Sequence, residues 1–385
     1  MRSPEASSLV AAPEEGARTT HAMVFSGGVA LGAYHAGAYA TLQEETGLDP
    51  DWVAGASIGA VTAAIIAGNV PERRSEQLRR FWDGIVADPM PWASLGFGQL
   101  GPALPWRQAQ GWASATQARL LGRPGLFRPR LFPWAESRTP GLYDLEPLRR
   151  RIEEVVDFEL LNSDGAPRLS VVATDLSSGE RVICDTGRGT RIRPEHVVAS
   201  CALLPDFAPV EIEGRLLGDG GLSTNTPLDL VLDEPRDGDL VCFVLDLFAR
   251  DGPSPRSLPA AVARAEDLIF AGQTSLILDG RRREQRLRAM IARLERKLPD
   301  ELRADPDVAS ILKEGRSNAV TVLHLAYLTS AGEADFQKIF DFSSAALAER
   351  WEAGAQDMRA ALNELAVHEG DATGPVGLVV HKVRS

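Results

Sequence analysis

Three glycine-containing motifs in this 385-residue chain could position reactive groups. The first, Gly55-Ala56-Ser57-Ile58-Gly59, fits the pattern G-x-S-x-G between an expected strand and an expected helix. Small residues permit a sharp turn that projects a serine side chain, and the helix start stabilises negative charge on its oxygen. The same five residues could instead form a packing turn between strand and helix, so the motif by itself leaves both interpretations open.

A second glycine turn covers residues 26–32, with the sequence SGGVALG. A dinucleotide-binding fingerprint would need glycine where Val29 stands. A phosphate-binding P-loop would need Lys followed by Ser or Thr where Ala33 and Tyr34 stand. An oxyanion hole needs only exposed backbone N–H groups at a helix start, and it is the one interpretation that also uses Ser57.

The third motif is Gly218-Asp219-Gly220-Gly221, which ends an expected strand. An Asp-Gly pair most often marks a simple turn. A glycine loop, a G-x-S-x-G and this Asp-Gly-Gly, with Asn225 downstream, nevertheless form one constellation in a fixed order.

The elements around these motifs predict an α/β domain. Short apolar runs that stop at glycines are typical of buried parallel strands, and here they alternate with stretches compatible with helices. Expected strands cover residues 22–25, 52–55, 169–173, 182–184, 216–218, 240–245 and 320–325, and expected helices cover 33–45, 57–67, 259–298 and 343–367.

The three motifs, in this order, resemble those of the patatin-like phospholipase family. Residues 199–205 (ASCALLP), which lead to 208–210 (APV), resemble the segment that precedes Asp-Gly-Gly in that family, and the resemblance covers about residues 23–230. Residues 340–343 (FDFS) and 350–354 (RWEAG) resemble the tail of a bacterial branch with a C-terminal extension.

The resemblance implies a three-layer α/β/α fold with a mostly parallel central sheet, and ester hydrolysis by a Ser–Asp dyad without metal or organic cofactor. Ser57 would be the nucleophile and Asp219 its general base. The N–H groups around Gly27, Gly28 and Val29 would form the oxyanion hole, supported by the motif glycines Gly55, Gly59, Gly220 and Gly221.

The expected organisation has three parts. Residues 1–20 would be a mobile tail, 21–235 the catalytic domain, and 236–385 a mainly helical extension packed on that domain.

Two residues depart from the family pattern in the first glycine loop. Val29 stands where the family often has a third glycine, and Leu31 where it often has a cation. Because a β-branched residue tolerates positive φ poorly, we expect Val29 in an ordinary backbone region, from which its N–H can still donate.

A conventional triad would need one of the six histidines. His324 follows the serine and the aspartate in the order that an α/β-hydrolase requires, but it lies in an expected core strand, where a structural histidine is more common. His35 follows the glycine loop closely, and we interpret it as a helix residue.

Composition excludes several classes of protein. The formal net charge of −12 argues against nucleic-acid binding, and no run of 18 apolar residues predicts a transmembrane helix. The N-terminal residues lack the layout of a signal peptide. Cys184, Cys201 and Cys242 show no metal-ligand spacing, so we expect buried thiols and a cytoplasmic location.

Two segments suggest contact with lipid. Residues 89–135 contain four tryptophans and five arginines but no carboxylate, so they predict a lid or a membrane-contact surface. Residues 281–297 contain eight basic and two acidic residues around an apolar stripe, Leu287, Met290, Ile291 and Leu294. We hypothesise reversible attachment to anionic membranes through one or both; buried tryptophans and a solvated basic helix face are the alternatives.

The expected function is therefore lipid ester hydrolysis of the phospholipase A or lysophospholipase type. A carboxylesterase acting on other acyl esters is the alternative within the same chemistry, because no residue specifies a head group. A non-catalytic membrane-associated scaffold is favoured by Val29 and opposed by the intact Ser57 and Asp219, and a nucleotide-binding enzyme ranks third. Head group, acyl position, oligomeric state and the purpose of the extension are not encoded in recognisable motifs.

Overall fold

The computed structural model describes residues 18–88, 104–134, 138–252, 254–255, 258–315, 318–329, 338–370 and 377–383. Most of the expected N-terminal tail, and residues 89–103 and 135 of the Trp/Arg-rich segment, therefore lie outside the described part. The first strand begins at Thr20, slightly before the expected end of the tail.

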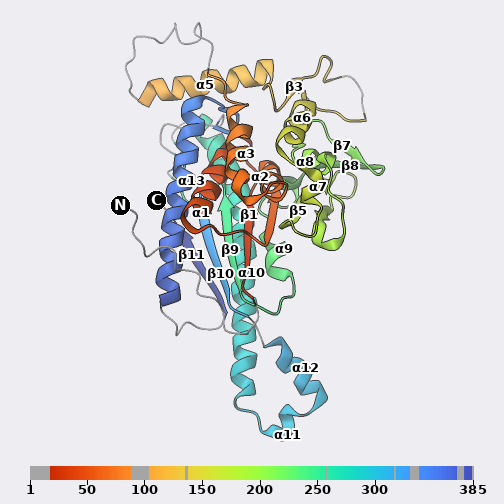
Figure 1. Ribbon diagram of the computed structural model, residues 1–385, viewed down its shortest axis with the longest axis vertical. Coiled ribbons are helices and arrows are strands. Elements are labelled where there is room, and N and C mark those ends of the chain that lie inside the picture. Colours follow the sequence, from red (N-terminus) through yellow and green to blue (C-terminus); the bar gives the residue numbers. More distant parts are fainter. Residues whose placement is uncertain are drawn as a thin grey trace.

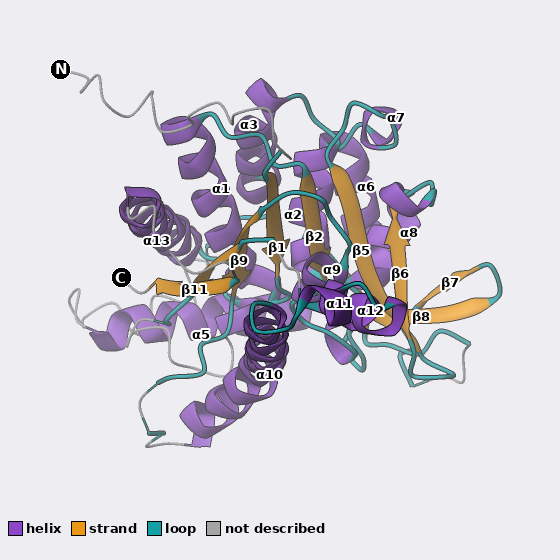
Figure 2. Ribbon diagram, turned by 90° about the horizontal axis from the view of Figure 1, so that it is seen from below, coloured by secondary structure: helices purple, strands orange, loops and turns teal. Residues whose placement is uncertain are grey.

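A nine-stranded sheet forms the centre of the molecule (Figures 1 and 2). Its strands follow the order β11-β10-β9-β1-β2-β5-β8-β7, with β6 also paired to β5. The first six run parallel, whereas β6, β7 and β8 are antiparallel additions at one side. The strands are β1 (Thr20–Phe25), β2 (Trp52–Ala56), β5 (Arg168–Asp175), β6 (Arg181–Asp185), β7 (Val210–Ile212), β8 (Arg215–Asp219), β9 (Leu240–Asp246), β10 (Val320–Ala326) and β11 (Leu378–Val383); β3 (Arg128–Pro129) and β4 (Tyr143–Asp144) form a separate pair.

Helices cover both faces of this sheet (Figure 2). Alternate residues of β1 point to opposite sides, as the pleat of a strand requires. Met23 and Phe25 pack into one core with α1, α2 and α13, whereas Ala22 and Val24 pack into a second core with α9 and α10. The fold is therefore the expected three-layer α/β/α arrangement with a mostly parallel sheet.

The helices are α1 (Ala33–Thr46), α2 (Ile58–Ala67), α3 (Pro71–Asp83), α5 (Leu104–Leu121), α6 (Glu146–Val155), α7 (Phe158–Leu161), α8 (Pro194–Ser200), α9 (Leu228–Asp233), α10 (Leu258–Glu295), α11 (Asp300–Arg303), α12 (Pro306–Glu314) and α13 (Ser344–Gly370). Short 3-10 turns are η2 (Val29–Gly32), η3 (Thr186–Arg188), η4 (Gly220–Leu222) and η5 (Lys338–Phe340). All seven expected strands and four expected helices are present, with ends within three residues of those predicted.

The C-terminal extension is integral to the sheet. It is helical along α10 and α13, as expected, but it also supplies β9, β10 and β11. Strand β9 pairs with β1 over six residues, so the two parts share one continuous sheet. The residues on the two sides of position 235 therefore belong to one sheet, and the extension is more than an outer layer packed on the catalytic part. The C-terminal half of α10 projects from the molecule together with α11 and α12. This projection lies at one end of the molecule, and α5 lies at the other (Figure 1).

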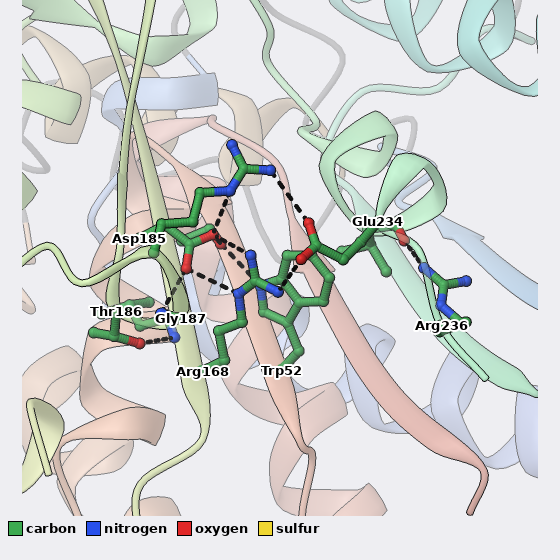
Figure 3. Close-up of polar contacts among 11 residues, drawn as sticks. Trp52, Arg168, Asp185, Thr186, Gly187, Glu234 and Arg236 are labelled. Atoms are coloured by element: carbon green, nitrogen blue, oxygen red, sulfur yellow. Dashed lines mark hydrogen bonds and ion pairs between the residues drawn. The ribbon is translucent and has the colours of Figure 1, made fainter. Parts of the chain in front are cut away.

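A polar network ties together the amino ends of β2 and β5 (Figure 3). Trp52 and Arg168, the first residues of these strands, are register partners, and the Arg168 guanidinium stacks 3.9 Å from the Trp52 ring centroid. Arg168 makes two hydrogen bonds of 2.9 Å to Asp185 and one of 2.9 Å to Glu234. This fork-to-carboxylate geometry gives Arg168 a strong and directional partner.

Asp185 is buried, and it also accepts hydrogen bonds from the Ser170 hydroxyl and the Gly187 N–H, both at 2.8 Å. Burial acts to raise the pKa of Asp185, but the bonds from Arg168 and Ser170 outweigh it and hold the pKa below its ordinary value. The ionised form is therefore the one that the fold stabilises.

We predict that Asp185→Asn lowers the free energy of unfolding by about 3 kcal/mol near pH 7, because it breaks a buried ion pair. The folded-state pKa is depressed, so this contribution is present above the unfolded pKa of about 4 and is lost as the pH falls below it. Urea unfolding at pH 7 and pH 3.5 measures both effects. The control Arg188→Ala removes a half-exposed partner of Glu234 and should cost under about 1 kcal/mol. Equal losses in the two variants would contradict this account.

Candidate active site

Ser57 occupies a sharp turn between β2 and α2. Its backbone has φ 55° and ψ −128°, a conformation that non-glycine residues seldom adopt. The turn is possible because Gly55 and Gly59 cross closely: a Cβ on Gly55 would lie 2.3 Å from the Gly59 backbone, and one on Gly59 would lie 2.3 Å from the Phe25 carbonyl. The local geometry is therefore that of a nucleophile elbow, as the G-x-S-x-G motif predicts.

The backbone of Ser57 is held from α8. Its N–H donates to the Ser200 hydroxyl at 2.9 Å, and that hydroxyl donates to the Val172 carbonyl of β5 at 2.5 Å. The Cys201 thiol, next in the chain, lies near the Ser57 hydroxyl, and burial raises the pKa of this thiol well above its usual range. Cys201 therefore stays a neutral neighbour of the serine.

Asp219 reaches the same point from the other side of β5. The register pairs Ala56 of β2 with Val172 of β5. It also pairs Ala173, the next residue of β5, with Asp219 of β8, so the aspartate lies level with Ser57. The chain then crosses β5 at Gly220, where a Cβ would lie 2.3 Å from the Val172 carbonyl. The structure thus brings together the serine and the aspartate that the motifs single out.

The carboxylate of Asp219 accepts a hydrogen bond from the Gly221 N–H at 2.6 Å, and the Ser57 hydroxyl lies near enough to act on its pKa. The exposed fraction of Asp219 is 2%, and that of Ser57 is 7%. Burial raises the pKa of Asp219 to about 7, against the lowering effect of the Ser57 hydroxyl and the Gly221 N–H. An aspartate with this pKa is a stronger base than a solvated one and is still substantially ionised at neutral pH.

The glycine loop after β1 lies beside Ser57. A Cβ on Gly27 would lie 3.0 Å from the Ser57 Cβ. The Gly27 N–H, however, donates to the Asn225 carbonyl at 3.1 Å. Within the described residues, the N–H groups of Gly28 and Val29 donate to no other group. The Gly27 N–H is therefore already bonded within the protein, and Gly28 and Val29 are the stronger candidates for oxyanion donors.

The backbone of Val29 was expected in an ordinary region, and this prediction is wrong. Val29 has φ 48°, in the left-handed region. Such a conformation costs a β-branched residue on the order of 1–3 kcal/mol and persists only where surrounding structure enforces it. The loop therefore has the backbone conformation that a third glycine would adopt. With valine at position 29, other residues must hold the loop in this conformation.

Two comparisons with known families bear on this site. Residues 23–232 match the family model described as patatin-like phospholipase, which is more than half of the chain. The chain belongs to the patatin-like phospholipase family. Residues 268–371 match a second model, described as patatin phospholipase, and this span contains the expected C-terminal motifs. Membership supports hydrolysis of lipid acyl esters in general.

Other comparisons add less. No curated protein matches the chain. The crystal structure of VipD from Legionella pneumophila is similar at 15% identity and a TM-score of 0.39, over 91% of this chain and 68% of that one. At this level of similarity we rest no inference on VipD.

Neither of the two histidines considered for a triad, His35 and His324, joins Ser57 and Asp219 in this patatin-like chain. His35 lies in α1 and packs edge-on against Phe25, and burial lowers its pKa to about 3. His324 lies in β10, as expected of a strand residue, with its ring nitrogen 3.4 Å from Asp246. Because β10 and β2 are three strands apart, about 14 Å, His324 and Ser57 belong to different regions. Among the described residues, no His, Cys, Asp and Glu side chains group together to suit a metal ion.

Sequence reasoning missed several residues that hold the site. Ser200 supports the Ser57 backbone, and Asn225 and Gln273 support Gly27: the Gln273 side-chain oxygen accepts the Asn225 N–H at 2.7 Å. Asn225 follows Asp-Gly-Gly closely and could have been suspected. Nothing local marks Gln273, which lies in α10, far along the chain.

We predict that kcat/KM for an ester substrate rises with pH and levels off, with its midpoint near pH 7, because Asp219 must be ionised to accept a proton. Burial also raises the pKa of Glu266, in α10, to about 7. The control Glu266→Gln should therefore leave the midpoint unchanged. A profile that is flat from pH 5 to 8, or a midpoint lost in Glu266→Gln, would contradict the assignment.

Proposed function

We propose that this protein is a serine acyl hydrolase that cleaves lipid esters of the phospholipase A or lysophospholipase type, with Ser57 as nucleophile and Asp219 as general base. The observation that carries the proposal is that the strand register brings Asp219 level with Ser57, with both side chains buried and the serine at a strained strand-to-helix turn. Strain of this kind accumulates at functional sites, where the surrounding structure maintains it.

The proposed reaction has two balanced halves. Asp219 takes the Ser57 hydroxyl proton as the oxygen attacks the acyl carbon, and the carbonyl electron pair moves onto the oxyanion. The N–H groups of Gly28 and Val29, with the start of η2, stabilise that charge. The intermediate collapses, and the leaving alkoxide takes the proton from Asp219. Water then attacks the acyl-serine with Asp219 again as base, releasing the fatty acid and restoring Ser57.

Two alternatives keep the same fold. A carboxylesterase acting on other acyl esters would use the same residues, and a substrate series separates the two. If the protein were a non-catalytic scaffold, the strained Val29 would mark an oxyanion loop that has lost its function. The raised pKa of Asp219 counts against the scaffold, because an unused buried carboxylate only destabilises the fold at neutral pH.

We predict that a fluorophosphonate probe labels the wild type, that Ser57→Ala abolishes labelling, and that Asp219→Asn slows labelling by at least about 100-fold, the usual scale of general-base catalysis.

The folded-state pKa of Asp219 is raised, so its favourable contribution to stability is present at low pH and is lost as the pH rises through 7.

Asp219→Asn should consequently melt at a higher temperature than the wild type at pH 8, and by a smaller margin at pH 5. The melting temperature of Asp219→Asn thus shows whether slower labelling comes from the missing base or from an unfolded protein. Wild-type protein that stays unlabelled, both alone and with phospholipid vesicles, would overturn the proposed function. Turnover of phospholipids against simple esters then decides between the two enzymatic alternatives.

An exposed apolar tip is the candidate surface for lipid. It comprises Leu120, Leu121, Leu131, Phe132 and Trp134, from the end of α5 and the turn after β3, with exposed fractions from 62% to 88%. Side chains of this size exposed together are uncommon in a soluble protein and mark interaction surfaces. No described helix is long and apolar enough to cross a bilayer.

The tip lies at the end of the molecule that contains the candidate site, because η5 packs between α5 and η2. Leu287, Met290 and Leu294, in the C-terminal half of α10, are also exposed. That half of the helix extends toward α11 and α12, at the opposite end of the molecule (Figure 1). One flat bilayer cannot contact both ends. Since the ester must reach Ser57, we infer that the tip, rather than α10, contacts lipid.

This contact would be mainly apolar. Two arginines near the tip lie against carboxylates: Arg128 pairs with Asp144 at 2.8 Å, and Arg119 lies 3.9 Å from Asp206. Arg123 is buried and donates to the Ile85 carbonyl, and Arg130 donates to the Thr139 carbonyl. These arginines are thus engaged within the protein. Attraction to anionic head groups would therefore be a minor part of the binding.

We predict that replacing Leu131, Phe132 and Trp134 together by serine weakens partitioning to phospholipid vesicles by at least about tenfold, since each side chain contributes roughly 1.5–3 kcal/mol on full burial. The matched variant with serine at Leu287, Met290 and Leu294 should bind like the wild type. Flotation with neutral and anionic vesicles, at low and high salt, measures both. Loss in the α10 variant alone, or binding that high salt abolishes, would contradict the proposal.

A further inference from the structure

The oxyanion loop is supported by a buried arginine from the C-terminal extension. Arg350, in α13, is fully buried and is the largest such side chain among the described residues. Its guanidinium donates to the Ala30 carbonyl at 3.0 Å, to the Asp341 carbonyl at 2.8 Å and to the Lys338 carbonyl at 2.9 Å. One side chain therefore joins η2, η5 and α13, and Ala30 is the residue that follows the strained Val29.

The position of α13 is itself fixed against the start of the catalytic core. Helices α1 and α13 cross at two glycines: a Cβ on Gly37 would lie 1.9 Å from the Trp351 carbonyl, and one on Gly354 would lie 2.0 Å from the Tyr34 carbonyl. The Tyr34 hydroxyl donates to Asp357 at 2.6 Å. Because α1 begins directly after η2, this crossing sets where the Arg350 guanidinium meets the loop.

The other end of the loop is held from the extension as well. The Gln273 side chain of α10 accepts the Asn225 N–H, and the Asn225 carbonyl accepts the Gly27 N–H. The two candidate donors, Gly28 and Val29, lie between these anchors. A loop with glycine at position 29 would adopt φ 48° unaided, but one with valine reverts to negative φ unless it is held.

We propose that Arg350 is a positioning residue that compensates for Val29: by holding the Ala30 carbonyl, it keeps Val29 in the left-handed conformation and its N–H directed to the oxyanion. This inference rests on the proposed function. It assigns the extension a role in catalysis, although Arg350 need not touch the substrate.

The test is a double-mutant cycle between Arg350 and Val29 in the full-length protein. Arg350→Lys keeps the charge but lacks the fork that reaches three carbonyls. We expect its kcat on a p-nitrophenyl acyl ester to fall about 100-fold, the cost of one lost oxyanion donor, with KM changed less than about threefold. In the Val29→Gly background, the same substitution should cost less than about fivefold, because glycine needs no support.

Two controls keep the test specific. Arg359→Ala also removes a hydrogen bond between α13 and the core, to Glu45 of α1 at 2.9 Å, but it lies about two and a half turns from Arg350 and should leave kcat unchanged. Arg350→Gln, which buries no charge, replaces Arg350→Lys in the cycle if the lysine variant does not fold. All rates are normalised to folded protein by circular dichroism.

Equal losses from the Arg350 substitution in the wild-type and Val29→Gly backgrounds would overturn the inference, because Arg350 would then act on packing alone. An unchanged kcat in Arg350→Lys would overturn it too. Wild-type protein that neither reacts with fluorophosphonate nor turns over ester would instead refute the proposed function, and this outcome is read from the wild type alone.

Discussion

The backbone conformation at Ser57 is the constraint on which the rest of the site depends. A serine at φ 55° is stable only if the strand before it and the helix after it cannot relax. The interlocked Gly55 and Gly59 provide this on one side, and Ser200 holds the serine N–H on the other. The register of β5 then determines where Asp219 lies along the sheet, so the placement of Asp219 beside Ser57 follows from sheet geometry.

Sequence reasoning succeeded where the cause of the structure is local. The elbow at Ser57 and the crossing at Gly220 need small residues at fixed spacing, and such spacing is visible in the chain. Sequence reasoning failed where a residue far away in the chain determines the local hydrogen bond or backbone conformation. The Gly27 N–H is taken by Asn225, 198 residues away, and the φ of Val29 runs against its intrinsic preference. The partners of Arg168 at residues 185 and 234 have no recognisable motif either.

The two models that match this chain describe parts that the structure joins closely. The first ends at residue 232, before β9, yet β9 lies directly beside β1 in the sheet. The loop after β1 therefore has the candidate nucleophile on one side and elements of the extension on the other. Truncation near the end of the first match would expose the edge of β1 and remove Gln273 and Arg350 together. We therefore expect the extension to be required for folding of the catalytic part.

The two ends of the parallel strands carry opposite electrostatic arrangements. At the amino ends, Asp185 is buried with a full set of partners that includes a guanidinium, and its pKa is depressed. At the carboxyl ends, Asp219 is buried with a hydrogen bond from a backbone N–H and no cationic partner among the causes of its shift, and its pKa is raised. The first arrangement stabilises the ionised carboxylate and therefore the fold at neutral pH, whereas the second destabilises the ionised form, as the proposed general base requires. A guanidinium beside Asp219 would add stability but would lower the basicity of the carboxylate, so the ion pair suits the end of the sheet to which no reaction is assigned.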